Sequence, residues 1–227
     1  MAPRICVSIG PEDVKSIEKE ANRAFQLGAD YVEIRFDFLK PDILPAALNA
    51  ATGIKDRTVY TLRPKSEGGM FAGGEENRVH WLYRLVEQEP LLVDVELDTL
   101  KKNDELADFL EGNKSPLLVS WHDFEKTPPS DYIADLLSEM RTYSNYVKIA
   151  TTAQSIEDSL RLLELYETAI GLYPIFFAMG DAGVISRLLC NIIGNAPFTY
   201  ASLEKTIAPG QLTVQQMKKL YNKMGCK

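Results

Sequence analysis

Eight short apolar runs, each followed by a helical pattern, are the feature that most constrains the fold of this chain. The runs recur at intervals of roughly 25–30 residues and cover residues 4–9, 31–36, 58–62, 91–97, 117–121, 146–149, 174–178 and 199–202. Strict alternation of strand and helix predicts a parallel sheet. Eight such units in 227 residues favour a single (β/α)₈ barrel over residues 1–227.

An open, doubly wound sheet of the flavodoxin or Rossmann type, with insertions, is the alternative architecture. No Gly-x-Gly-x-x-Gly pattern follows the first strand, which counts against that alternative. The chain also has no domain linker and no low-complexity segment. We therefore expect one α/β domain.

Capping residues and breaks predict where several helices begin and end. Pro11-Glu12-Asp13 predicts a helix start, and Gly28 ends the helical pattern that follows. Ser130, Ser155 and Thr213 are expected caps of later helices. Two longer loop signals, at 63–74 and 207–211, each follow a strand.

Composition and charge limit the classes of partner. Lys plus Arg is 25 and Asp plus Glu is 32, giving a formal net charge of −7 without a basic run, which speaks against nucleic-acid binding. No apolar stretch reaches the ~18–20 residues needed to span a bilayer, and no signal or transit leader is visible. Three cysteines without a CxxC pair predict neither a disulfide framework nor a zinc site. We expect a cytoplasmic protein without a metal.

Polar residues follow nearly every predicted strand, where a parallel barrel places its active site. They are Glu33, Arg35, Asp37, Arg63, Glu67, Asp94, Glu96, His122, Asp123, Lys148, Ser186, Arg187 and Gln211, and Met179 and Gly180 follow the seventh strand. Each also has a purely structural interpretation. Glu33 and Arg35 could form a simple ion pair, and Arg187 could lie on a helix surface. As a set at strand ends, however, they indicate a binding site.

Lys148 and His122 are the two residues that suggest a chemistry. Lys148 interrupts an apolar, strand-like run, so it either reaches water or a carboxylate at a strand end, or lies in a dry pocket as a nucleophile toward carbonyls. His122 follows the fifth strand, as a general acid/base would, whereas His80 lies in a helical stretch. Arginines are suited to binding a carboxylate, and their positive charge would disfavour the charged form of the lysine by like-charge repulsion. The parts predict imine chemistry on a small anionic keto compound.

The chain resembles the type I 3-dehydroquinate dehydratase family along essentially its whole length. The motifs that carry the resemblance are Glu33-Ile34-Arg35-Phe36-Asp37, Arg63 with Glu67-Gly68-Gly69, Asp94-Val95-Glu96-Leu97, Ser120-Trp121-His122-Asp123-Phe124, Val147-Lys148-Ile149-Ala150, Met179-Gly180, Ser186-Arg187 and Ala208-Pro209-Gly210-Gln211. The resemblance implies a barrel that dehydrates 3-dehydroquinate to 3-dehydroshikimate, in the shikimate pathway of aromatic amino acid biosynthesis. It also implies no metal or organic cofactor, and a homodimer.

The same resemblance implies residue roles. Lys148 would form the Schiff base with the C3 ketone, His122 would shuttle protons, and Glu67 would orient or tune His122. The residues expected to bind the substrate are Glu33, Arg35, Arg63, Arg187, Met179 and, from a closing loop, Gln211. Ile207 stands where relatives often have a serine, so the lid contact would fall to Thr206 or be absent. No fused shikimate dehydrogenase is expected.

Two rival interpretations remain at this point. Another Schiff-base barrel, an aldolase or transaldolase, would place a phosphate near Gly180, Gly183 and Gly194. A non-catalytic barrel that serves in binding or assembly would tolerate loss of Lys148.

Overall fold

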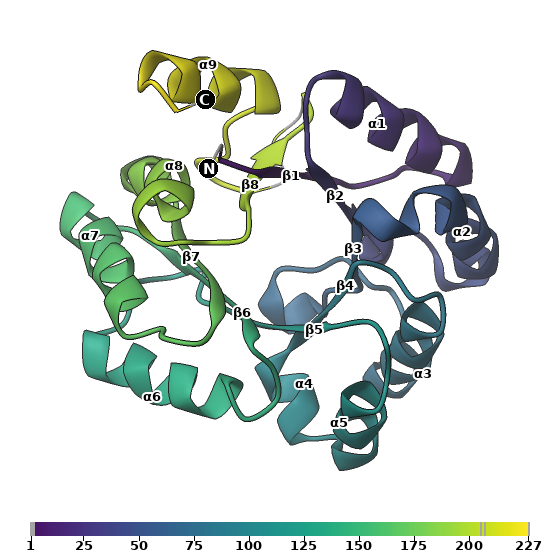
Figure 1. The fold of residues 1–227 in the computed structure, drawn as a ribbon. Helices are drawn as coiled ribbons and strands as arrows, with labels where there is room; N and C mark the ends of the chain where they lie inside the picture. The colour runs from purple at the N-terminus through teal and green to yellow at the C-terminus, as the bar shows by residue number, and fades with distance from the viewer. Residues whose placement is uncertain (1–2, 205, 207, 227) are drawn as a thin grey trace.

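Eight parallel strands form one sheet that curls into a barrel, with helices on its outside (Figure 1). The computed structural model describes residues 3–204, 206 and 208–226. The strands are β1 Ile5–Ile9, β2 Tyr31–Arg35, β3 Thr58–Thr61, β4 Leu92–Glu96, β5 Leu117–His122, β6 Tyr146–Thr152, β7 Tyr173–Met179 and β8 Thr199–Ser202. All eight predicted strands are confirmed, although β6 runs three residues further than expected.

The order of strands excludes the doubly wound alternative. Each strand from β1 to β6 pairs with the next one along the chain, and β8 pairs with β1. A doubly wound sheet would reverse direction at a switch point, and this sheet does not. The barrel prediction is therefore confirmed.

The helices lie between successive strands and cover the outer face of the barrel (Figure 1). They are α1 Val14–Gln26, α2 Leu44–Ala51, α3 Glu75–Val86, α4 Leu97–Lys101, α5 Asp104–Glu111, α6 Ser130–Met140, α7 Ile156–Glu164, α8 Val184–Ile193 and α9 Val214–Lys223. In the part of the chain that the structure describes, none is long and apolar enough to cross a membrane.

Side-chain caps fix several helix starts. Asp13 Oδ1 accepts the Ser16 backbone N–H at 2.8 Å, and Thr213 Oγ1 accepts the Gln216 N–H at 3.2 Å. Ser155 likewise heads a capping box. Ser130 is different, because it is the first residue of α6 rather than its cap. Ser130, Ser155 and Thr213 thus mark helix starts to within one residue, whereas α1 begins at Val14, after Pro11-Glu12-Asp13.

The barrel interior is apolar at one end. Val59, Leu92, Leu118 and the half-buried Tyr146 come from the first two residues of their strands and belong to one inward-facing cluster. Side chains on the inner face alternate with those facing the helices. With this end filled, the polar residues of the later strand positions line the opposite, carboxyl end.

The barrel is not closed by hydrogen bonds between β7 and β8, which we call the β7–β8 seam. On the seam side of β7, Pro174 has no N–H to offer. The Phe176 N–H donates to Tyr166 Oη at 2.7 Å, and the Ala178 N–H donates to Ser186 Oγ at 2.8 Å. Side chains from the covering helices therefore take the place of an eighth strand pairing. The closed barrel of the prediction is corrected to a nearly closed one.

Replacement of Ser186 by alanine tests this substitute pairing. The Ser186 side chain is fully buried, so Ser186→Ala leaves the Ala178 N–H without its acceptor. Such a loss costs about 1–3 kcal/mol. We expect a matching decrease in the free energy of unfolding from denaturant titration. Ser138→Ala, which removes an exposed helix serine, should stay within about 0.5 kcal/mol of the wild type; equal stabilities for the two variants would contradict the account.

Candidate active site

A cavity of about 570 Å³ opens at the carboxyl ends of the strands. This central cavity is lined by Ser8, Glu33, Arg35, Arg63, Glu67, Gly68, His122, Phe124, Lys148, Ala150, Phe177, Met179, Arg187, Tyr200, Ala208 and Gln211. Nine of the ten predicted site residues are in this set. The tenth, Thr206, is exposed and lines a neighbouring hollow with Phe38 and Leu203, and Ile207 lies outside the described residues.

Lys148 lies inside the barrel on β6, and only 3 % of it is exposed. Its ammonium donates a short hydrogen bond to Asp94 and lies 3.6 Å from Glu33 Oε1. The two interpretations left open by the sequence therefore both hold in part, because the amine pairs with a carboxylate and also faces the central cavity. The negative charges of Asp94 and Glu33 oppose the repulsion expected from the arginines.

His122 ends β5 and pairs with Glu67, which comes from the loop after β3. The distance from His122 Nδ1 to Glu67 Oε2 is 2.8 Å. Burial, assisted by the charges of Arg63, Lys148 and Arg35, lowers the pKa of His122 well below its ordinary value. Burial and the charge of Glu96 raise the pKa of Glu67 to about 8. The imidazole is therefore neutral near pH 7 and able to accept a proton.

The loop that carries Glu67 is built by two glycines. Gly68 adopts φ 72°, a left-handed conformation that favours glycine. A Cβ on Gly69 would lie 2.0 Å from the Arg63 carbonyl oxygen, so only glycine fits there. This tight turn brings Glu67 back over the barrel mouth to meet His122.

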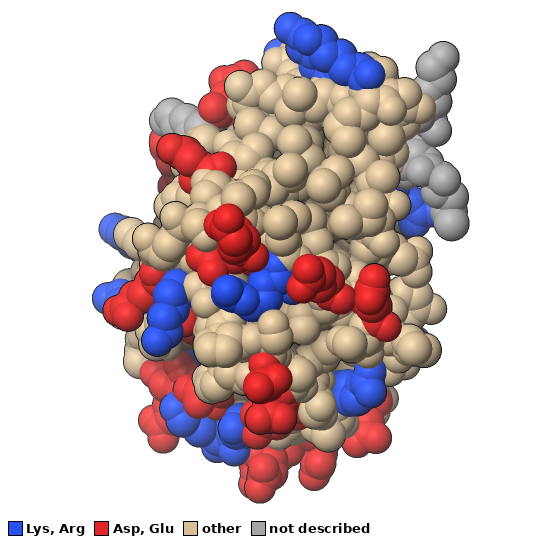
Figure 2. Space-filling view, turned by 90° about the vertical axis from the view of Figure 1, so that its left-hand side faces the viewer, with Lys and Arg blue, Asp and Glu red and all other residues tan. Residues whose placement is uncertain are grey.

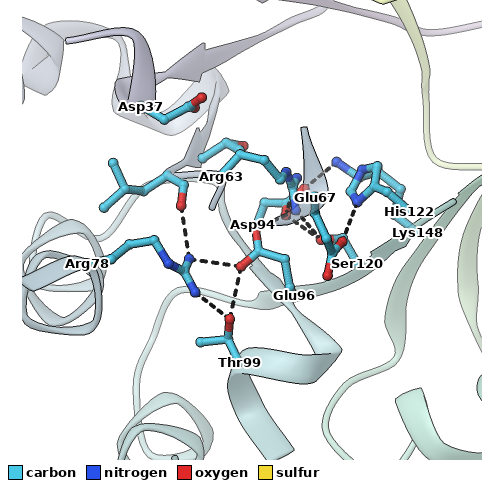
Figure 3. Close-up of polar contacts among 12 residues, drawn as sticks. Asp37, Arg63, Glu67, Arg78, Asp94, Glu96, Thr99, Ser120, His122 and Lys148 are labelled. Carbon is cyan, nitrogen blue, oxygen red and sulfur yellow. Dashed lines mark hydrogen bonds and ion pairs between the residues drawn. The ribbon is translucent and has the colours of Figure 1, made fainter. Parts of the chain in front are cut away.

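Arg63 organises the carboxylates beneath the cavity (Figure 3). Its guanidinium donates to Asp94 Oδ1 and Glu96 Oε1, each at 2.6 Å, and to Ser120 Oγ at 2.7 Å. Burial opposes the ionisation of Asp94, but the charges of Arg63 and Lys148 outweigh it and hold its pKa below the ordinary value. Arg63 thus fixes the carboxylate that holds the amine of Lys148.

Arg78 is a member of this network that the sequence analysis missed. It comes from α3 and is 1 % exposed, and it donates to Glu96 Oε2 at 2.9 Å and to the Leu62 carbonyl at 3.0 Å. Thr99, shown in Figure 3, and Glu75 complete its contacts. In the sequence, Arg78 is one of several charged residues at a polar helix start and shows no sign of a special role. Its contact with Glu96 exists only in the folded chain.

Arg187 is buried, so the helix-surface interpretation of this residue is wrong. Its guanidinium lies 4.2 Å from the Phe177 ring, and its Nε and Nη2 atoms have no hydrogen-bond partner among the described residues. Burial lowers its pKa to about 10. A buried, unpaired guanidinium is costly without a counter-ion, so this position of the cavity is suited to a carboxylate.

Arg35 and Glu33, two further residues predicted to bind the substrate, each have their own hydrogen-bond partners. Arg35 makes two hydrogen bonds to Asp37, at 2.8 and 2.7 Å, whereas Glu33 accepts from Ser8 at 2.7 Å and Thr61 at 2.9 Å. The expected alternative of a Glu33–Arg35 ion pair is therefore wrong. Among the described residues, no three His, Cys, Asp or Glu side chains are arranged to hold a metal ion.

Comparison with known proteins assigns the chain to a family. The profile of type I 3-dehydroquinases matches residues 5–227. The chain belongs to this family. It is 33 % identical over 223 residues to the 3-dehydroquinate dehydratase of Methanopyrus kandleri, covering 97 % of this chain and all of that protein.

Solved structures of family members have the same fold. The type I 3-dehydroquinate dehydratase of Clostridium difficile, whose crystal structure holds covalently modified comenic acid, matches with a TM-score of 0.86 at 28 % identity, over 98 % of this chain and 92 % of its own. The 3-dehydroquinate dehydratase of Aquifex aeolicus matches with a TM-score of 0.80 at 32 % identity, over 97 % and 98 % of the two chains. Membership of this family sets aside the aldolase, transaldolase and non-catalytic alternatives.

The raised pKa of Glu67 gives the stability a pH dependence that Glu67→Gln should remove. A carboxyl with an ordinary pKa of 4.5 and a folded-state value of about 8 stabilises the fold below about pH 4.5, and this contribution is lost as the pH rises through 8. Relative to the wild type, Glu67→Gln should therefore gain stability between pH 5 and pH 8, by at least about 1 kcal/mol. Denaturant titrations at both pH values measure this. Glu87→Gln, at an exposed glutamate, should give no such trend, and a flat difference for Glu67→Gln would refute the assignment.

Proposed function

We propose that this chain dehydrates 3-dehydroquinate to 3-dehydroshikimate and water through an imine on Lys148. One observation carries the proposal: a buried lysine amine, a neutral histidine and an unpaired buried arginine line the same cavity. Family membership supports 3-dehydroquinate as the substrate, since relatives across the family are named for this reaction.

Binding comes first in this proposal. The substrate carboxylate pairs with Arg187, whose free N–H groups lack partners among the described residues. Arg35, Arg63 and Glu33 hold the ring hydroxyls and the remaining carboxylate contact, and Met179 packs along the ring. This placement brings the C3 ketone to Lys148 in the part of the cavity where Asp94 holds the amine.

Imine formation then proceeds from the paired ammonium. The ammonium loses a proton, the nitrogen lone pair bonds to C3, and the carbonyl electrons move to oxygen. That oxygen takes two protons and departs as water, so that R–NH₃⁺ + O=CR₂ gives R–NH⁺=CR₂ + H₂O. The iminium keeps the positive charge of the ammonium, and Asp94 therefore retains a cationic partner throughout.

His122 carries the protons of elimination. Its neutral imidazole removes a proton from C2, and the electrons form the C2=C3 bond of an enamine. The enamine electrons then form the C1=C2 bond and expel the hydroxyl at C1. This hydroxyl leaves as water with the proton from His122. Hydrolysis of the imine releases the product. Glu67 orients the ring through its 2.8 Å contact with Nδ1, and the imine itself is the electron sink, so the proposal includes no cofactor or metal.

The loop after β8 is the proposed lid. Gln211 is buried and lines the central cavity, and Thr206 lies on the same loop. Closure of such a loop keeps water away from the iminium. Thr206 is proposed as the substitute for the lid contact that Ile207 does not offer.

Trapping with borohydride tests the covalent step. In the presence of 3-dehydroquinate, borohydride should attach the ligand mass to Lys148, located by peptide mass spectrometry. His122→Ala should still form the adduct but turn over roughly 10²–10⁴-fold more slowly. Lys148→Met should form none, whereas Lys102→Met, at an exposed lysine, should behave as the wild type. An adduct on another lysine, or normal turnover in His122→Ala, would refute the assignment.

We also propose that the chain is a cytoplasmic homodimer. The structure describes three free cysteines, which suits a reducing compartment. In α8 the polar Ser186 and Arg187 face inward, whereas Ile185, Ile192 and Ile193 are 37, 38 and 60 % exposed. α8 has no exposed charged residue, and much of the upper half of the face shown in Figure 2 is likewise uncharged, as expected of a contact surface.

An acidic substitution on this face should separate the subunits. We expect wild-type protein at micromolar concentration to sediment as a dimer and Ile193→Asp to sediment as a monomer, because a buried unpaired carboxylate is costly. Met224→Asp, at an exposed methionine after α9, is the matched control and should remain dimeric. A monomeric wild type would contradict the proposal.

A further inference from the structure

Tyr200 has a buried hydroxyl that faces no partner. It lies on β8, is 3 % exposed and lines the central cavity. Its Oη atom has no hydrogen bond to any described residue. Burial of an unpaired hydroxyl costs roughly 1–3 kcal/mol, and phenylalanine would fill the same space without this cost. The free protein is thus less stable than it could be at this position.

The ring of Tyr200 is held firmly beside the reacting amine. It lies 5.5 Å from the Phe198 ring and 5.9 Å from the Phe177 ring, one on each side of the seam. The ammonium of Lys148 lies 4.9 Å from its centroid. The ring of Tyr200 therefore lies beside the atom that forms the covalent bond.

The hydroxyl is available as a donor. Burial, and then the charge of Glu33, raise the pKa of Tyr200 well above its ordinary value, so the phenol keeps its proton. Ser8, which bears the other hydroxyl that lines the cavity, already donates to Glu33 at 2.7 Å. An oxygen of the substrate close to Lys148 would meet Tyr200 as a free hydroxyl donor.

We propose that the Tyr200 hydroxyl donates a hydrogen bond to the ketone oxygen while Lys148 attacks the carbonyl carbon. The inference rests on the proposed function and adds a residue to it. As the N–C bond forms, the carbonyl electrons move to the oxygen, and a preorganised donor stabilises this developing charge. Tyr200 keeps its proton throughout, and both protons that the oxygen receives come from the ammonium of Lys148, one of them relayed by the neutral His122. Tyr200 is then a catalytic residue of imine formation rather than of elimination.

Tyr200→Phe removes only the hydroxyl and tests this role. Protein and 3-dehydroquinate are mixed rapidly and quenched with borohydride, and the Lys148 adduct is followed over time. We expect adduct formation to slow by at least about tenfold, since loss of one such donor typically costs 10²–10³ in rate. The midpoint of unfolding should stay equal or rise, because an unpaired buried hydroxyl is gone. This opposite movement of rate and stability is not expected of a structural residue.

Tyr60→Phe is the matched control. The Tyr60 hydroxyl is also buried without a partner among the described residues, but the residue does not line the central cavity. Its variant should trap the adduct at the wild-type rate. A Tyr200→Phe variant that traps at the wild-type rate, or that slows only the later elimination, would overturn the inference. Failure of the proposed function is distinct, because then the wild type itself would trap no adduct.

Discussion

The ion pairs of Arg63 with Asp94 and Glu96 are the interaction on which the rest of the site depends. Two carboxylates and a guanidinium are buried here at 2.6 Å, where none would be tolerated alone. Lys148 is the second cationic partner of Asp94, and Arg78 is the second cationic partner of Glu96. Removal of one partner from such a set typically costs 3–5 kcal/mol, because another charge is left unpaired. The same contacts that keep these groups in a barrel interior also fix the amine in one place.

This arrangement reconciles an ion-paired lysine with a nucleophilic one. In the proposed reaction, the iminium presents the same positive charge to Asp94 as the ammonium of the free protein. The proposed covalent intermediate therefore keeps the ion pair that the free protein has. Arg187 lies apart from this set of ion pairs, and its Nε and Nη2 atoms have no hydrogen-bond partner among the described residues.

The sequence predicts those parts of the site that break a local pattern. Lys148 interrupts an apolar run, and His122 ends one, so both are visible without a structure. Arg78 and Tyr200 break no pattern, because arginine is ordinary near a helix start and tyrosine is ordinary in a strand. Their functional meaning comes from contacts between distant segments, such as Arg78 to Glu96. The seam was not visible, because Pro174 begins the predicted run 174–178 and proline is also tolerated at the first residue of a central strand.

The seam joins the fold to the chemistry. Because β7 and β8 are not hydrogen-bonded to each other, Arg187 of α8 can place its guanidinium over Phe177 of β7 while its carbonyl accepts a hydrogen bond from Thr199 of β8 at 2.8 Å. Polar residues therefore occupy the inner face of α8, and its isoleucines are exposed on the outer face. An outward apolar face is unfavourable in water, so a second subunit that covers it would offset the cost of an inward-facing arginine. In this sense the anion site and the proposed dimer share one structural origin.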